Sequence, residues 1–163
     1  MKKIMIVSPN KVLAQGLMST VQNRPGLNFE WLAQLGYSEA AIGVDVYHAD
    51  VVILDVMDEV VADQVLELCR TLRKGNSGIC LLLLVRQDQS NVRTMAVKAK
   101  QAGIADDFVF YDSSLAYLFA KLAALQEIAD VRTELFMRRE YGKTLLRAMI
   151  MAALLRQYRT NSV

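Results

Sequence analysis

Acidic residues that follow an apolar run are the first candidates for chemistry in this chain. Residues 51–58 read VVILDVMD, so Asp55 ends a run of β-branched and apolar residues, and Asp58 and Glu59 follow closely. Asp55 could be a chemical group at the mouth of a site, or only the polar residue that ends a buried strand. Which of these two roles Asp55 has depends on the other side chains at the same edge of the sheet to which this strand would belong.

Other reactive side chains are few, and their spacing matches no familiar site. His48 is the only histidine and has no catalytic partner at a recognisable spacing, so we expect a surface residue and not a general base. Cys69 and Cys80 lie in apolar stretches without CxxC spacing, which predicts buried reduced thiols. The loop that begins at Ser8 lacks the glycines of a dinucleotide, FMN or P-loop site. These residues predict no cofactor.

Length and composition indicate one ordinary domain with an appendage. The chain has 163 residues, of which 53% are hydrophobic and 22% charged. Its longest apolar runs, ICLLLLV and AMIMAALL, are far below the roughly 20 residues that cross a bilayer. The N-terminal residues lack the apolar core of a secretory signal, so we predict no membrane span and a cytoplasmic location.

The charge divides the chain in two. Residues 1–129 hold 12 Lys and Arg against 14 Asp and Glu, and residues 130–163 hold 7 against 3, which gives −2 and +4. We therefore predict a domain over residues 1–129 and a basic C-terminal extension over 130–163.

Within the first 129 residues, short apolar runs alternate with amphipathic stretches, the pattern of strands that feed helices. We predict strands at 3–7, 28–35, 49–55, 79–85 and 106–112, with helices at 11–24, 38–47, 60–75, 90–103 and 113–129. Val12, Leu13, Leu17 and Val21 are expected on one face of the first helix, and Asp112 is expected to cap the fifth. Five such units predict an α/β fold with a parallel sheet and helices on both faces.

Four segments give the chain a resemblance to a known family. They are KIMIVSPNKVLAQGL, GLNFEWLAQLGYSEAAI, ADVVILDV and AGIADDFVFYDSSLAYL. In this order they resemble the CheY-like receiver domains of two-component response regulators, most closely the receivers that precede LuxR-type DNA-binding domains. The similarity covers about residues 2–128. It implies a flavodoxin-like, doubly wound sheet of five parallel strands in the order 2-1-3-4-5.

The resemblance places Asp55 at the phosphoacceptor position, but the residues around it depart from the family pattern. The acidic pair that holds Mg²⁺ in such receivers falls on Ser8 and Pro9, the hydroxyl residue on Val85, and the lysine on Tyr111. Mg²⁺ needs hard oxygen ligands, and it neutralises the charge of the incoming phosphoryl group. A lone carboxylate should bind Mg²⁺ poorly, so we expect a degenerate pocket.

The expected function is therefore a non-enzymatic signalling or scaffolding module, an atypical receiver without a cofactor that acts through protein contacts. The alternative is a response regulator receiver that is phosphorylated at Asp55 with Mg²⁺, with Asp58 or Glu59 supplying oxygens. A small-ligand binder that uses the same crevice is a third hypothesis. Arg86 and Tyr111 could hydrogen-bond Asp55, but a solvated Arg86 and a Tyr111 packed on a helix is the favoured interpretation.

The basic extension could continue the fifth helix, with Gly142 as a weak point or break. In LLRAMIMAALL (145–155) only one residue, Arg147, is polar, and a helix that is apolar all round must be buried. We predict a homodimer through these helices, with packing onto the receiver or docking to another signalling protein as alternatives. Nucleic-acid binding is disfavoured because no helix-turn-helix pattern follows. The predicted interaction surface consists of Leu145, Leu146, Met149, Ile150 and Leu154.

Overall fold

The computed structural model describes residues 1–160, so the last three residues of the predicted extension, 161–163, lie outside the described residues. The chain divides into two compact units, Met1–Ala129 and Asp130–Val163. The first unit holds the sheet, and the second consists of helix in its described part.

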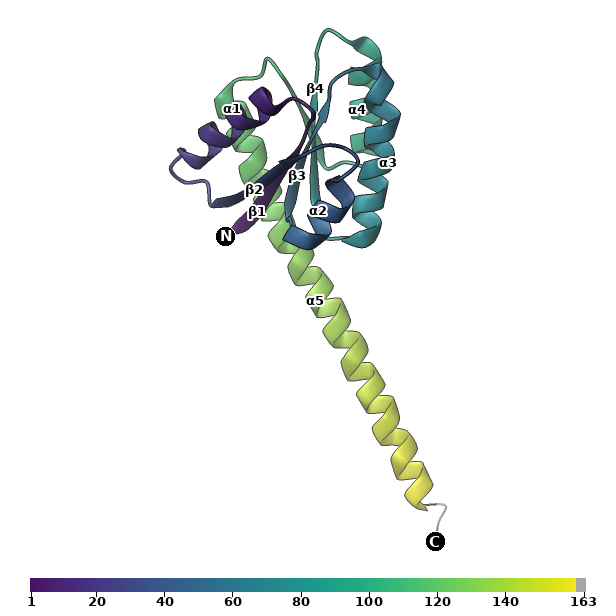
Figure 1. The fold of residues 1–163 in the computed structure, drawn as a ribbon. Helices are drawn as coiled ribbons and strands as arrows, with labels where there is room; N and C mark the ends of the chain where they lie inside the picture. The colour runs from purple at the N-terminus through teal and green to yellow at the C-terminus, as the bar shows by residue number, and fades with distance from the viewer. Residues whose placement is uncertain (161–163) are drawn as a thin grey trace. The chain divides into compact units, whose positions relative to one another are not determined.

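A five-stranded parallel sheet forms the centre of the first unit (Figure 1). Its strand order is β2-β1-β3-β4-β5, which confirms the predicted flavodoxin-like α/β fold. β3 and β4 are buried along their whole length, which explains why their sequences are nearly continuous apolar runs. The strands are β1 (Lys2–Val7), β2 (Phe29–Leu35), β3 (Val51–Val56), β4 (Cys80–Val85) and β5 (Asp107–Phe110).

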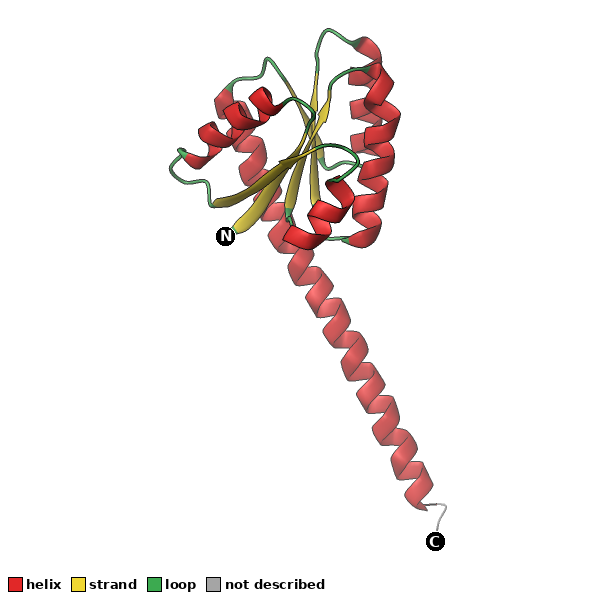
Figure 2. Cartoon of the chain, viewed as in Figure 1, coloured by secondary structure: helices red, strands yellow, loops and turns green. Residues whose placement is uncertain are grey.

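Helices cover both faces of this sheet (Figure 2). α2, α3 and α4 pack on one face, and α1 and the first part of α5 pack on the other. Because the strands are parallel, their carboxyl ends meet at one edge, where candidate site residues can come together. The helices are α1 (Lys11–Gln22), α2 (Ala40–Tyr47), α3 (Glu59–Gly75), α4 (Ser90–Gln101) and α5 (Leu115–Thr160).

The predicted apolar face of α1 was wrong at Val12, whose side chain is 80% exposed. Ala14 and Val21 are the fully buried residues of this helix, and Leu13 and Leu17 pack beside them. At about 100° per residue, positions 12 and 21 lie on opposite sides of a helix. Val12 therefore faces solvent when Val21 faces the sheet.

The predicted cap of α5 was also wrong. The backbone N–H of Tyr117 donates to Ser114 Oγ at 3.2 Å, so Ser114 and not Asp112 caps the helix. The chain first makes a turn after β5, in which Ser113 N–H donates to the Phe110 carbonyl, and the helix begins at Leu115. This turn moves Asp112 too far from the free amides to cap them.

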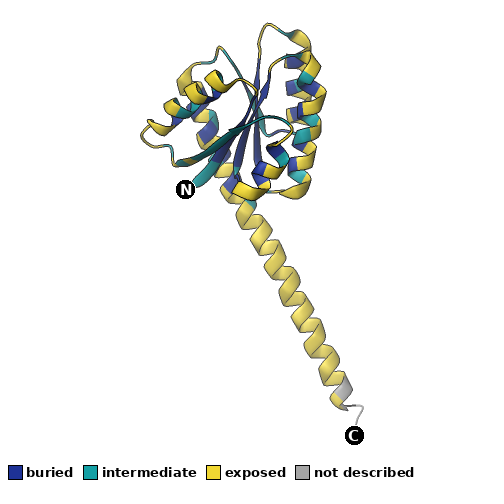
Figure 3. Cartoon of the chain, in the orientation of Figure 1, coloured by how far each residue is buried: buried dark blue, intermediate teal, exposed yellow. Residues whose placement is uncertain are grey.

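In the second unit α5 passes through Gly142 without a break, and its side chains are largely exposed (Figure 3). None of the helices among residues 1–160 is long and apolar enough to span a membrane.

The two cysteines and the histidine all lie in the first unit. Cys69 and Cys80 are buried free thiols, as predicted, and burial raises the pKa of Cys69 to about 12. His48 is exposed, and it ends α2 in a left-handed conformation with φ of 55°.

Candidate functional site

The carboxyl ends of β1 and β3 bring Ser8 and Asp55 together. The two strands are neighbours with Val7 opposite Leu54, so the next residues of each chain also meet. Ser8 Oγ donates a hydrogen bond to Asp55 Oδ2 at 2.6 Å, and both residues are 0% exposed. Ser8 Oγ in turn accepts a hydrogen bond from the Asn10 backbone N–H at 2.9 Å, which ties the start of α1 to the same group.

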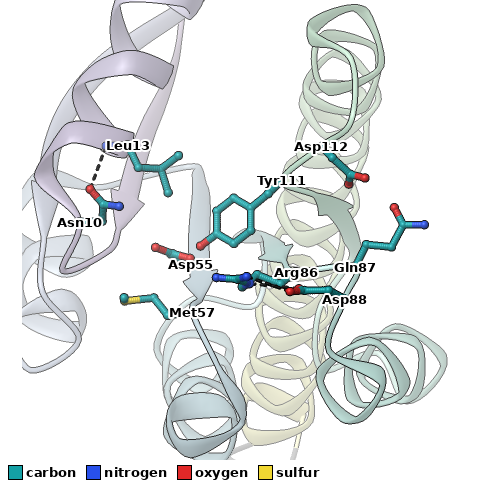
Figure 4. Close-up of a pocket in the computed structure, with 9 residues that line it drawn as sticks. All are labelled: Asn10, Leu13, Asp55, Met57, Arg86, Gln87, Asp88, Tyr111 and Asp112. Atoms are coloured by element: carbon teal, nitrogen blue, oxygen red, sulfur yellow. Dashed lines mark hydrogen bonds and ion pairs between the residues drawn. The ribbon is translucent and has the colours of Figure 1, made fainter.

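Asp55 also borders a pocket of about 470 Å³ at this edge of the sheet (Figure 4). Polar and charged residues predominate in the lining of the pocket, and Figure 4 shows the Tyr111 hydroxyl pointing toward the Asp55 carboxyl group. The lining residues are Asn10, Leu13, Asp55, Met57, Arg86, Gln87, Asp88, Tyr111 and Asp112.

Burial dominates the electrostatics of Asp55. Desolvation raises the pKa of its carboxyl group, and the hydrogen bond from Ser8 opposes this only in part. The second oxygen, Oδ1, is buried and has no hydrogen-bond partner. Burial therefore disfavours the ionised form of this carboxyl group, which is the form that acts as a nucleophile and as a metal ligand.

Two polar residues of this edge were missed by sequence reasoning. The Tyr37 hydroxyl donates to the Asp55 backbone carbonyl, and Gln34 Nε2 donates to the Ser8 carbonyl. Burial, with the nearby charges of Asp55 and Asp58, raises the pKa of Tyr37 to about 12, so its hydroxyl stays a donor. Both residues lie at or just after the end of the second predicted strand, and the rule that parallel strands end at one edge could have found them.

The remaining positions of the predicted pocket lie as follows. Val85 is fully buried at the end of β4, opposite Val56. Pro9 is exposed and does not line the pocket. Tyr111 is half-buried and packs against the cluster under α1 and α5, as the favoured interpretation predicted. Arg86 is exposed and makes an ion pair with Asp88 at 2.8 Å, which also agrees with that interpretation.

Asp58 and Glu59, the candidate substitute ligands, are used elsewhere. Asp58 Oδ1 accepts the Val61 backbone N–H at 3.1 Å and caps α3, and Glu59 Oε1 accepts from Asn91 Nδ2 at 2.8 Å. Within residues 1–160, no three histidine, cysteine or acidic side chains are grouped so as to hold a metal ion. The Ser8 hydroxyl donates to Asp55, and the Asn10 amide hydrogen donates to Ser8 in turn, so neither residue brings a carboxylate oxygen for Mg²⁺ to Asp55.

The predicted interaction surface is open in the isolated chain. Its five side chains are between 50% and 62% exposed. These residues are Leu145, Leu146, Met149, Ile150 and Leu154.

Comparison with known proteins gives matches in structure alone. No protein-family model and no curated protein matches the sequence. A receiver domain of the Francisella response regulator 1452 is 18% identical with a TM-score of 0.62, over 78% of this chain and 98% of that one. A LuxR-family two-component response regulator from Aurantimonas sp. SI85-9A1 is 22% identical with a TM-score of 0.57, over 80% and 97%. The fold is that of a CheY-like receiver domain. The predicted resemblance is thus confirmed for the fold.

A further structural match carries a different description. A structure described as an adenylate cyclase from Rhodopirellula baltica is 17% identical with a TM-score of 0.68, over 82% of this chain and 93% of that one. At such identities the likeness concerns the fold, and the chemistry must be argued from the site.

Proposed function

We propose that this chain is an atypical receiver, a non-enzymatic signalling or scaffolding module that acts through protein contacts and not through phosphoryl transfer. The observation that supports this most directly is the hydrogen bond between Ser8 and Asp55, made where both side chains are fully buried. The receiver fold itself supports a response-regulator-like signalling role.

The argument against phosphoryl transfer is electrostatic. A dianionic phosphoryl group approaching a carboxylate needs a cation to neutralise the charge. Ser8 brings a neutral hydroxyl in place of a carboxylate, and its hydroxyl is already bonded to Asp55. Burial holds the pKa of Asp55 above its usual range, which reduces the ionised form that would attack. Val85 has no hydroxyl at the position of the hydroxyl residue, and Tyr111 has no ammonium group at the position of the lysine, so both groups that would hold the product are missing from those positions.

One observation favours the alternative, a receiver that is phosphorylated at Asp55. Asp55 borders a pocket that Asp88 and Asp112 also line, so further carboxylates are within the same space. Asp88 is engaged by Arg86, however, and that pair would have to open before Asp88 could bind a cation.

Beryllofluoride with Mg²⁺ separates the two functions, because it mimics a bound phosphoryl group only where the acceptor and the cation site are both present. Calorimetric titration of the full chain should show no saturable response. A saturable response that disappears in Asp55→Asn, and persists in Asp63→Asn as the control at an exposed position of α3 outside the pocket, would establish the alternative.

A gain-of-function variant tests the same argument from the other side. Ser8→Asp combined with Pro9→Asp introduces the acidic pair of such receivers after β1, with the carboxylate of residue 8 next to Asp55, so it should introduce Mg²⁺-dependent beryllofluoride binding that the unmodified chain lacks. Binding that is equal in both proteins would show that the missing acidic pair is not what limits the chemistry.

We also propose that the chain associates with itself through the helix of the second unit. Large apolar side chains are exposed along this helix, from Val131 at 55% to Leu155 at 64%. Exposed apolar surface of this extent is typical of an interaction site.

A further inference from the structure

One oxygen of the Asp55 carboxyl group lacks a donor. Oδ2 accepts the hydrogen bond from Ser8, but Oδ1 is buried and has no hydrogen-bond partner among the described residues. Asp55 is 0% exposed and borders the pocket of about 470 Å³. Buried polar atoms in folded proteins are nearly always hydrogen-bonded, so a ligand that donates to Oδ1 from this pocket would be stabilised.

The Tyr111 hydroxyl lies on the same side of the pocket. It points toward the Asp55 carboxyl group in Figure 4, and Tyr111 is half-buried. A phenolic oxygen accepts a hydrogen bond as well as donating one. Asp55 Oδ1 and the Tyr111 oxygen therefore offer two acceptors to one ligand group.

The charges of the pocket favour a cation as that group. The lining holds the carboxyl groups of Asp55, Asp88 and Asp112 against a single guanidinium group, that of Arg86. The ion pair of Arg86 with Asp88, at 2.8 Å, cancels one charge of each sign. A cation beside Asp55 also favours the ionised carboxylate, which burial alone opposes. The remaining acidic groups attract a cationic ligand and repel an anionic one.

Among cations, an ammonium group fits these acceptors best. Mg²⁺ needs an octahedral set of oxygen ligands. A guanidinium group makes its strongest contact with two carboxylate oxygens side by side, and Oδ2 of Asp55 already accepts from Ser8. An ammonium group donates along separate directions, so one N–H can reach Asp55 Oδ1 and another the Tyr111 oxygen.

The rest of the lining sets the size of the ligand. Leu13 and Met57 border the pocket together with Tyr111, so an apolar body has side chains to contact. The volume of about 470 Å³ lies in the lower part of the range for small-molecule pockets, roughly 300–1,000 Å³. This space suits an amine with a short alkyl or phenylalkyl body.

We infer that the pocket beside Asp55 binds a small primary amine, whose ammonium group donates to Asp55 Oδ1 and to the Tyr111 oxygen. Amine binding goes beyond the proposed function, since a chain that binds no amine could still act through protein contacts.

Calorimetric titration of the full chain with 2-phenylethylamine at neutral pH tests the site. The amine should bind saturably, and 2-phenylethanol, which has the same body without the charge, should bind about tenfold more weakly or not at all. Equal binding of the alcohol, or no saturable binding of the amine, would overturn the inference.

Two substitutions test the acceptors. Asp55→Asn removes the carboxylate at nearly constant shape and should abolish saturable binding of 2-phenylethylamine. Tyr111→Phe removes only a hydroxyl and should weaken the binding about fivefold. Asp63→Asn, at an exposed position of α3 outside the pocket, is the matched control and should bind as the wild type does. Binding that persists in Asp55→Asn, or is unchanged in Tyr111→Phe, would contradict the assigned position of the ammonium group.

A third substitution tests the charge of the pocket. Arg86→Gln removes the only guanidinium group of the lining and leaves the Asp88 carboxylate unpaired, so the amine should bind roughly threefold more tightly. Lys74→Gln changes the net charge equally at an exposed position in the last turn of α3 and should leave the affinity unchanged. Equal affinities of the two variants would show that the charges of the pocket do not select the ligand.

Discussion

At the scale of single residues, the charge state of Asp55 is the central variable. One of its oxygens accepts a hydrogen bond from Ser8 and the other is buried without a partner. Burial of an unsatisfied polar atom is costly, and the cost grows when the atom is part of an ionised group. Ionisation of Asp55 therefore lowers the free energy of unfolding of the wild-type protein.

Asp55→Asn should remove this penalty in a pH-dependent manner. The pKa of Asp55 is raised above 3.8 in the folded state, so ionisation costs stability as pH rises from about 3.8 through the raised value and costs nothing more above it. The free energy of unfolding of the variant minus that of the wild type should rise with pH across this window and then level off. Urea titrations at a series of pH values measure it. A difference that does not change with pH would contradict the shifted pKa.

Ser8→Ala should destabilise the fold by about 1–3 kcal/mol, because it leaves Asp55 Oδ2 and the Asn10 amide without their shared partner. Ser19→Ala is the control, since the Ser19 hydroxyl bonds to the Gly16 carbonyl on the exposed side of α1. Its effect should stay within about 0.5 kcal/mol. Chemical denaturation of both variants compares them, and equal losses would speak against a special role of Ser8.

The site was predictable as a set of positions and not as a set of contacts. The resemblance to receiver domains assigns Ser8, Asp55, Val85 and Tyr111 to one pocket, and the rule that parallel strands end together agrees with this. The hydrogen bond from Ser8 and the full burial of Asp55 depend on side-chain packing across three strands, which no local pattern in the sequence encodes. Tyr37 was missed because it bonds to a backbone carbonyl, and such a bond leaves no motif.

At the scale of elements, the strands were predicted within two residues because their apolar runs are short and well separated. The errors lie at helix termini, and the predicted ends at 24 and 103 fall two residues beyond the observed ends of α1 and α4. Val12 in the first turn is apolar like the buried residues of α1, but it lies on the side opposite Val21 and faces solvent. The capping residue depends on where the preceding turn ends, and this turn moved the cap of α5 from Asp112 to Ser114.

The cap of α3 gives a prediction at this scale. Asp58→Ala removes the acceptor for the Val61 backbone amide and should cost about 1 kcal/mol. Asp63→Ala, at an exposed position inside the same helix, should be neutral or slightly stabilising because alanine is the better helix former. Thermal unfolding of the two variants gives the comparison. A loss as large in Asp63→Ala would mean that acidic charge, and not capping, supports α3.

At the scale of the whole molecule, the two units should separate in function. Deletion of residues 140–163 removes the apolar segment and leaves the core clusters of the first unit intact. The shortened protein should therefore be monomeric and keep a cooperative unfolding transition, as measured by sedimentation and by circular dichroism on heating. Retention of the oligomeric state of the full chain would place the interface in the first unit.

The two buried cysteines have a practical consequence. Both thiols lie inside the first unit, Cys69 with a pKa of about 12 and Cys80 donating to the Leu125 carbonyl at 3.4 Å. A thiol reacts as its thiolate and only where a reagent can reach it. The native protein should therefore react very slowly with maleimide dyes. A fluorophore attached at an introduced surface cysteine would then label one site. Slow labelling of Cys69 and Cys80 would measure the rate at which the first unit unfolds.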